Sequence, residues 1–519
     1  MSAIITDQLR ILNAKNFVSS ATSSSNCYYS FVGLPNASDY SINWDRNPPS
    51  PRDSFEQEND YWDTIIALKK INESDVSPVV KKITWSSGLV YDMYRHDISR
   101  NNTSKPSGAT RLYSANYYVI NSDFKVYICL SNGTDPENPS GKPSLDEPNF
   151  TDLEPKSAGD SGDGYIWKYL YSIKPSEIVK FDTIDFIPVP KDWSTSSNFF
   201  PIRNNASTEN NQLKIITITN RGSNLGPPNR IYTNVPINGD GFGAKATIVI
   251  NNDSKVESIN ISSGGSGYTY GTVDLLSGNV PTGPTSSSAP TFDVIIPPKG
   301  GHGYDIYREL GAYNVLIFSR IENDIENPDF IIGNKIARIG IVENPEAYNS
   351  NSLLDLDKAS STHAIKLSGI GYSNAIFPPN SVFTQTISLG STAVGRVISY
   401  DQNTGVLKYW QDKSLVGFNT DGSQNYSPTY GFELNRFTNS VGTGGTTLIT
   451  NTNLYIDDTF TGFSTTLNNR NYNLGQSFIN GISNPEVKKY SGNIIYVDHR
   501  PSITRSSNQK EDIKVILQF

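Results

Sequence analysis

The stretch of this chain whose residue types could most readily take part in catalysis is Gly159–Asp163, where glycines and aspartates flank a serine. A turn of this composition can present a hydroxyl as a nucleophile. Asp163, however, occupies the position where a sharp nucleophile turn needs a second glycine, and the serine would also need a histidine base within reach. The chain has only four histidines. We therefore interpret the stretch as a tight polar turn that precedes a strand.

The same acids could begin a calcium-binding loop. Asp160, Ser161 and Asp163 would supply oxygen ligands at its start. Calcium loops of this spacing close on a glutamate, and Tyr171 stands at that position instead. A turn again explains the residues better than an ion site.

The remaining reactive residue types form no known site pattern. His302 lies between glycines, but one histidine makes no site, and His363 and His499 have no partner at metal-ligand spacing. No Gly-x-Gly-x-x-Gly or Walker-type loop opens a helix. Paired carboxylates for glycoside hydrolysis stay open, because 51 acidic residues offer many pairs, although nothing singles one out. We predict no catalytic residue, no cofactor-binding residue, no cofactor and no metal ligand.

The element that must position the polar turn is the alternating segment Gly162–Ile173. Its aromatic residues recur at every second position, and its aliphatic residues lie mostly on the other side. This period is typical of a strand. Since both sides are apolar or aromatic, we expect other parts of the chain to cover both faces.

Composition favours a β-rich, well-ordered protein. The 519 residues, enough for several domains, carry 43 basic and 51 acidic side chains, for a net charge of −8. No basic stripe emerges, so nucleic acid is a poor guess for a partner. Hydrophobic residues are only 36%, while turn-forming residues are abundant and 29 tyrosines and 22 phenylalanines argue against disorder.

The two cysteines and the start of the chain indicate where the protein is made. Cys27 and Cys129 are too few for a disulfide framework, and we expect two reduced core thiols. The first ten residues lack the pattern of a secretory signal, and no apolar stretch is long enough to span a membrane. We expect synthesis and folding in a reducing cytosol.

Several local patterns predict elements in the first two hundred residues. Residues 11–45 favour strand and loop, and Asp53–Ser54 can cap a helix that the apolar spacing carries from Phe55 to Lys69. Segments 117–121 and 124–130 predict a hairpin. The prolines of Ile187–Pro190 predict that the chain leaves the sheet there.

Two later regions are rich in glycine and polar residues. Residues 205–300 contain a weak repeat, in which 219–225 aligns with 262–268, and we interpret this region as a small inserted all-β module. Residues 350–480 form a second such region, in which 394–400 and 405–410 predict a hairpin. The chain closes on two strands, 493–497 and 513–517, so we expect its end to be tied into a sheet.

Several of these stretches together resemble one family. Gly162–Leu170 is similar to the Gly-Asp-Gly-Tyr-Val-Trp-Glu-Tyr-Leu of the baseplate wedge subunit, gene product eight, of T-even-like contractile-tailed bacteriophages. Arg338–Pro345, Ser491–Tyr496 and Arg500–Ile503 with the strand to Phe519 resemble the same family. The N-terminal series Pro48-Pro49, Asp53-Ser54, Trp62 and Trp85 follows in similar order. The chain is longer than the family's best-known member, and the extra length falls at about 205–300 and 350–480.

The resemblance implies a structural virion protein of the tail baseplate, made in the host cytoplasm. It implies a homodimer that docks to other baseplate wedge subunits, with no enzyme activity, no nucleic acid, no membrane and no small-molecule substrate as a partner. Large aromatic surfaces suit permanent contacts. We expect Trp167 in the core and keep Trp44, which precedes a proline connector, as an interface residue. A tail-associated adhesin or glycan-binding or glycan-processing protein remains the alternative, because the polar β regions could expose sugar-binding aromatics.

The expected fold is mainly β, with β-sandwich-like domains and a few short helices, in an elongated multi-domain chain with two inserted all-β modules. The boundaries follow from the composition shifts and the resemblance. They are 1–204 for the N-terminal part of the family core, 205–300 for the first inserted module, 301–349 for core strands, 350–480 for the second inserted module and 481–519 for C-terminal core strands.

Overall fold

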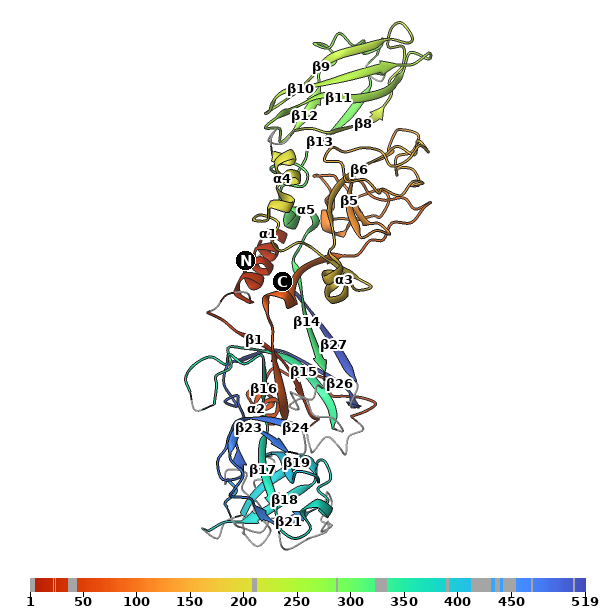
Figure 1. Ribbon diagram of the computed structural model, residues 1–519. Coiled ribbons are helices and arrows are strands. Elements are labelled where there is room, and N and C mark those ends of the chain that lie inside the picture. Colours follow the sequence, from red (N-terminus) through yellow and green to blue (C-terminus); the bar gives the residue numbers. More distant parts are fainter. Residues whose placement is uncertain are drawn as a thin grey trace. The chain divides into compact units, whose positions relative to one another are not determined.

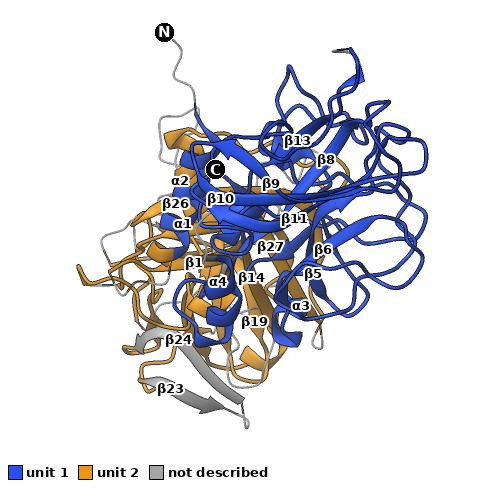
Figure 2. Ribbon diagram, turned by 90° about the horizontal axis from the view of Figure 1, so that it is seen from above, with its two compact units in different colours: residues 1–18, 77–316, 516–519 blue, residues 19–76, 317–515 orange. Residues whose placement is uncertain are grey.

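The computed structural model describes residues 5–21, 23, 25–35, 44–207, 212–285, 288–322, 334–348, 350–388, 392–411, 431–434, 439–441, 454–467, 470–506 and 509–519. The protein is mainly β, with several sheets and few short helices, as the composition predicts (Figure 1). Its chain forms two compact units, each built from segments far apart in sequence (Figure 2). Unit 1 comprises residues 1–18, 77–316 and 516–519, and unit 2 comprises residues 19–76 and 317–515.

The elements that lie wholly within unit 1 follow β3 in the chain. They are the short 3-10 helices Leu112–Ser114 and Ser197–Phe199, the helices α3 (Pro175–Phe181), α4 (Phe200–Ser207) and α5 (Ile306–Leu310), and the strands β4 (Tyr118–Ile120), β5 (Lys125–Asn132), β6 (Tyr165–Ser172), β7 (Phe186–Pro188), β8 (Ile215–Asn220), β9 (Ile231–Gly239), β10 (Phe242–Ile250), β11 (Val256–Ser266), β12 (Gly271–Val273) and β13 (Thr291–Ile295). The chain passes from one unit to the other within α1 (Asp7–Ala21), β3 (Val76–Lys81), β14 (Asn314–Glu322) and β27 (Lys510–Gln518).

The core of unit 1 surrounds the antiparallel sheet β4-β5-β6. The hairpin predicted over 117–130 is confirmed, since Tyr118 pairs with Ile128 and Ile120 with Val126. Strand β6 lies at the sheet's other side, with Trp167 opposite Cys129. Side chains on both faces of β6 are buried, Trp167 on one and Leu170 on the other, so the expectation that both faces are covered is confirmed.

Strands β8 to β13 build a region with its own hydrophobic cluster inside unit 1 (Figure 1, yellow to green). Its larger sheet has the order β11-β10-β9-β12, and β8 pairs with β13 as a two-stranded ribbon. The strands that lead into the two copies of the weak sequence repeat differ in length. Strand β8 ends at Asn220, near the start of the first copy, whereas β11 continues to Ser266, well into the second copy. Within the two copies the turns nevertheless correspond, because Gly222 and Gly265, and likewise Asn224 and Gly267, have positive φ, and both copies end on a buried side chain, Leu225 or Tyr268.

Unit 2 contains helix α2 (Phe55–Thr64), the short 3-10 helices Glu73–Asp75 and Tyr372–Asn374, and most of the later strands. The strands are β1 (Tyr28–Gly33), β2 (Ile65–Lys70), β15 (Lys335–Glu343), β16 (Lys358–Ser360), β17 (His363–Ser368), β18 (Val382–Thr386), β19 (Thr392–Asp401), β20 (Val406–Trp410), β21 (Asn439–Val441), β22 (Tyr455–Ile456), β23 (Gly462–Leu467), β24 (Arg470–Phe478), β25 (Ile482–Ser483) and β26 (Asn493–Thr504).

One sheet of unit 2 has the order β16-β2-β1-β15-β26 and joins the start of the unit to its end. A second sheet has the order β21-β18-β19-β20-β17-β22, with β25 pairing to β17, and β23 pairs with β24. The predicted hairpin over 394–410 is confirmed as β19 and β20, where Asp401 pairs with Val406. Residues 440–480, whose low apolar content favours loops, instead contain β22, β23 and β24 in their described part, so that expectation is wrong. Residues 412–430 and 442–453 lie outside the described residues. The five-part division of the chain stays a prediction.

The helix predicted from Phe55 to Lys69 is only half right. Ser54 caps it as expected, accepting a hydrogen bond from the Gln57 amide, but the helix ends at Thr64. Ile65 and the residues after it form β2, which pairs with β1 and β16 and is buried. A β-branched run with partners on both edges prefers the pleated conformation, so tertiary pairing overrides the helical spacing.

Two further expectations are wrong. Residues 7–21 form α1 rather than strand and loop, because this stretch has no glycine or proline and is rich in helix formers, although its apolar residues do not follow a clear helical stripe. The prolines of 187–190 do not take the chain out of the sheet at once, since Pro188 pairs with Val79 at the end of β7. Strand β7 lies at the edge of its sheet, where a missing amide donor is tolerated.

The strand expected at the C-terminus is confirmed. Strand β27 runs to Gln518, and the Phe519 amide donates to the Tyr313 carbonyl at 3.1 Å. Over the described part of the chain, every helix is too short or too polar to span a bilayer.

Candidate functional site

The turn before β6 is a structural turn held by Asp163. Its carboxylate accepts hydrogen bonds from the amides of Leu145 and Tyr165, each at 2.9 Å, and Gly162 and Gly164 on either side have positive φ. Asp163 is buried, whereas Asp160 and Ser161 are exposed. The Ser161 amide donates to Asp146, so the turn is tied to the preceding loop. The arrangement fits the interpretation as a polar turn.

The aromatic residues of β6 build the core. Trp167 is fully buried, as predicted, and stacks on Tyr165 with ring centroids 5.3 Å apart. The Tyr165 hydroxyl accepts from the Tyr91 amide and donates to the Lys142 carbonyl, which ties three segments together. Burial raises the pKa of Tyr165 well above its ordinary value. Its hydroxyl therefore stays protonated and serves as a structural hydrogen-bonding group.

Lys168, on the opposite side of β6 from Trp167, is a buried lysine that no motif or spacing in the sequence singles out. Its ammonium donates to the Leu153 carbonyl at 2.6 Å and to the Asn205 side chain at 3.1 Å. Burial lowers its pKa to about 8, and Glu309 partly offsets that fall. Asn205 in turn donates to Glu154. These contacts join β6 to helix α4, from which the chain enters the β8–β13 region.

The segment by which the chain leaves that region is held in a similar way. Nδ1 of His302 lies 2.6 Å from Oε1 of Glu309, and the Gly303 amide donates to the other carboxylate oxygen at 2.7 Å. The ring of Tyr94 meets the imidazole edge-on at 4.8 Å. All polar atoms of the Glu309 carboxylate therefore have partners within the protein, and the pair acts as a structural clip between α5 and the preceding loop.

The histidines singled out in the sequence do not come together. His96 accepts from the Ile296 amide, His302 contacts Glu309, His363 stacks on Tyr409 and His499 accepts from Arg338. Among the residues that the structure describes, no three histidine, cysteine or acidic side chains converge as metal ligands. Cys27 and Cys129 are buried and unlinked, as expected for core thiols, and burial raises the pKa of both.

A polar buried cluster of unit 2 corrects the expectation for Trp44. Arg338 is 2% exposed, and its guanidinium lies 5.3 Å from the Trp44 ring and 5.2 Å from the Tyr61 ring. His499 accepts from Arg338 Nε at 3.1 Å and contacts the Pro49 carbonyl through Nδ1 at 2.8 Å. Trp44 is itself only 4% exposed and donates to the Arg500 carbonyl, so it belongs to the core and not to an interface.

A cleft within unit 1 is a candidate for ligand binding, and unit 2 has two clefts of similar volume, one beside Tyr61 and Tyr496 and one beside Cys27 and Lys70. The cleft of unit 1 has a volume of about 410 Å³ and lies between residues 93–106, the loop 132–139 and the polar face of the β8–β13 ribbon. Volumes of about 300–1,000 Å³ are usual for small-molecule sites. The sequence suggested no cleft here, because its walls come from three distant segments.

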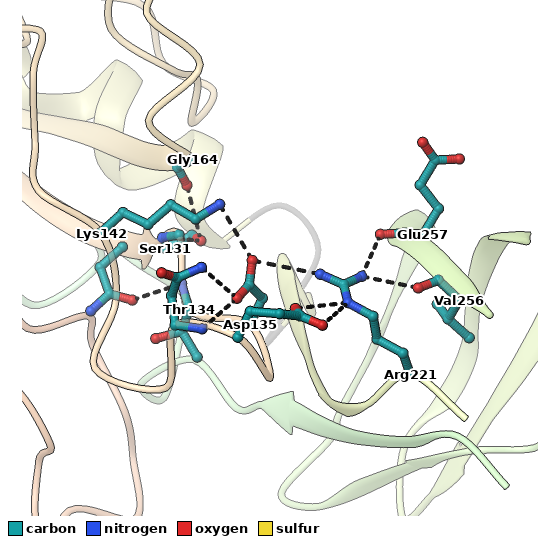
Figure 3. Close-up of polar contacts among 12 residues, drawn as sticks. Ser131, Thr134, Asp135, Lys142, Gly164, Arg221, Val256 and Glu257 are labelled. Carbon is teal, nitrogen blue, oxygen red and sulfur yellow. Dashed lines mark hydrogen bonds and ion pairs between the residues drawn. The ribbon is translucent and has the colours of Figure 1, made fainter. Parts of the chain in front are cut away.

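An arginine clamp fixes one end of this cleft (Figure 3). Arg221, just after β8, donates through Nε to Glu137 at 2.8 Å and through Nη1 to the carbonyls of Val256 and Glu257, each at 2.9 Å. Asp135 lies 3.6 Å from the same guanidinium and 3.3 Å from the Lys142 ammonium. Burial alone would raise the pKa of Asp135, but hydrogen bonds from Asn138 and Lys142 leave it below its usual value.

A second arginine holds the other side of the cleft. Arg95 donates to both carboxylate oxygens of Asp97, at 3.0 and 2.9 Å, and to Asp293 of β13 at 3.2 Å. Such bidentate pairs are among the stronger ionic contacts. Together the two arginines keep the ribbon at a fixed distance from the loops of unit 1.

Comparison with known proteins adds no identification. A scan of protein-family models and a search of curated proteins each returned no match to this chain.

Proposed function

We propose that this chain is a structural virion protein, a baseplate wedge component of a contractile phage tail, which acts by docking to a second copy and to other wedge subunits. The observation that carries the proposal is where the family-like segments lie. Gly162–Leu170 forms β6, in the core of unit 1. Arg338–Pro345 and Ser491–Tyr496 lie along β15 and β26, which pair in the main sheet of unit 2. The segments that carry the resemblance therefore lie in the core of unit 1 and in the main sheet of unit 2.

The polar clusters fit a scaffold better than an enzyme. Lys168, Glu309 and Arg338 are each buried and engaged in hydrogen bonds to protein groups. A catalytic side chain must reach a substrate in a plausible pose. We therefore assign these residues to holding the frame, and we propose no enzymatic activity.

Surface side chains supply a reason for docking. Among the described residues, five large apolar side chains far apart in sequence are more than three-quarters exposed: Phe55, Ile184, Phe242, Leu276 and Ile370. Covering such a side chain stabilises a complex by about 1.5–3 kcal/mol. A subunit with neighbours on several faces would cover them in the assembled tail, where we propose that the protein resides.

The mass of the purified full chain tests the docking proposal. Light scattering at micromolar concentration is expected to give twice the mass of the 57.1 kDa chain. A strict monomer that also fails to bind the wedge subunits encoded by the same phage would contradict the proposal.

A tail-associated adhesin or glycan-binding protein is the second candidate. The cleft of unit 1 is the specific observation that favours it. Binding by that cleft and docking in the baseplate are compatible, because they use different features of the molecule.

A further inference from the structure

The cleft of unit 1 contains a buried hydroxyl without a protein partner. Thr217 of β8 is only 5% exposed, and among the described residues its Oγ1 has no hydrogen-bond partner. A buried hydroxyl in that state has lost its hydrogen bonds to water without replacing them, which is unfavourable. Thr217 lines the cleft, but its Oγ1 has less than 1 Å² of accessible surface, so a bound group supplies the missing hydrogen bond only after a small shift of the side chain or the adjoining loops.

The strand alternation shows why this hydroxyl belongs to the cleft. Ile216 and Ile218, the neighbours of Thr217, belong to the hydrophobic cluster of the β8–β13 region. Successive side chains of a strand point to opposite faces, so Thr217 points away from that cluster. Its cross-strand partner is Asp293, which also lines the cleft. Further along the ribbon, where the register shifts and Thr291 pairs with Asn220, the hydroxyls of Thr219 and Thr291 share a hydrogen bond at 2.6 Å.

Most charged side chains of the cleft are already paired, which argues against an ionic ligand at its floor. Arg95 is engaged by Asp97 and Asp293, and Asp135 by Lys142 and Arg221. An anion at Arg95 would meet two carboxylates, and a cation at Asp135 would meet two positive groups. Lys105 also lines the cleft and is exposed, and the groups that remain are hydroxyls and amides, such as Thr103, Thr134 and Asn102, beside the apolar surfaces of three prolines.

A peptide strand is a poorer fit than a ligand with hydroxyl groups. Peptides that extend a sheet pair with the open backbone edge of a strand. Here the floor of the cleft is the side-chain face of the ribbon, carrying threonines and a carboxylate. Sugar hydroxyls both donate and accept, so they match an unpartnered threonine hydroxyl and a carboxylate placed side by side.

We propose that the cleft between the β8–β13 ribbon and the loops 93–106 and 132–139 binds a neutral saccharide, with Thr217 and Asp293 as contacting groups. This inference goes beyond the proposed structural role and does not depend on it. A baseplate subunit with such a cleft could hold a cell-surface glycan as well as its neighbours.

The test uses the full chain and a defined panel of probes. Saturation-transfer NMR is recorded with glucose, galactose, mannose, N-acetylglucosamine and short β-linked oligomers of each, beside glucuronate, glucosamine and an alanine tetrapeptide. We expect at least one neutral sugar to bind at millimolar concentration or below, and to slow hydrogen exchange in peptides covering 102–106 and 215–220.

Two matched variants assign the binding to the cleft. Thr217→Val removes only the unpartnered hydroxyl and should weaken the sugar about fivefold without loss of folding. Thr247→Val, on strand β10 of the same region, should bind like the wild type. The inference is overturned if no neutral sugar binds, if only the charged sugars or the tetrapeptide bind, or if Thr217→Val binds as tightly as the wild type. None of these outcomes bears on the mass of the chain, which tests docking separately.

Discussion

Two buried tryptophans of unit 1 differ in one respect that can be measured. Trp167 and Trp193 are 0% and 1% exposed and belong to the same hydrophobic cluster. Each stacks on an aromatic neighbour, Trp167 on Tyr165 and Trp193 on Phe199. The indole N–H of Trp193 donates to a backbone carbonyl at 3.1 Å, whereas among the described residues that of Trp167 has no partner. Replacing either tryptophan by phenylalanine therefore removes a similar volume, but only Trp193→Phe also removes a hydrogen bond.

The expected cost follows from these contacts. Loss of volume in a packed core should destabilise either variant by roughly 1.5–3 kcal/mol. Trp193→Phe also leaves the Tyr304 carbonyl without its donor, which adds about 1–2 kcal/mol. Trp167→Phe carries no such addition. We predict that Trp193→Phe is the more destabilising substitution by that margin.

The comparison needs a local probe, because a chain with two units has no single unfolding free energy. Hydrogen exchange of the peptide covering β6, followed over a urea series, reports the stability of the shared core. Trp193→Phe should exchange about five- to thirtyfold faster than Trp167→Phe at the same urea concentration. Equal rates, or faster exchange in Trp167→Phe, would refute the assignment of the hydrogen bonds.

Three further predictions concern both units. Burial and the neighbouring Arg338 guanidinium lower the pKa of His499 from 6.5 to about 4, so between pH 6.5 and 4 the unfolded state takes up a proton that the folded state does not. The free energy of unfolding of unit 2 should therefore fall by up to about 2–3 kcal/mol as the pH drops through this range. His499→Gln should reduce this pH dependence, as measured by urea unfolding at several pH values. Arg221→Ala should speed hydrogen exchange in residues 132–139 several-fold, while Lys156→Ala, which removes an exposed ion pair, should not. Gly340→Ala would place a Cβ 2.3 Å from the Phe31 ring and should destabilise unit 2 by about 1–3 kcal/mol, measured by hydrogen exchange of β15.

Local patterns predicted the elements whose partners lie close in sequence. The hairpins β4–β5 and β19–β20 could be read from alternation because each turn joins its own two strands. The start of helix α2 is predicted correctly, because it depends only on the local cap that Ser54 makes with the Gln57 amide. The predicted end of the helix is wrong. That end depends on β2 pairing with β1 and β16, and β16 lies far along the chain.

The candidate site could not be predicted for the same reason. Thr217 is one of many threonines in a polar region, and nothing in its neighbours distinguishes it. Its burial and its unpartnered hydroxyl arise only when loops 93–106 and 132–139 are brought against β8. Trp44 shows the converse error, since a proline connector suggested exposure while Arg338 and His499 bury the ring.

The most direct test of the docking role is electron microscopy of particles made when this gene carries an early stop codon. We expect these particles to lack an organised baseplate, and we expect the wild-type chain, when supplied, to restore it. Tails with an intact tip in the absence of the protein would contradict the proposed docking role.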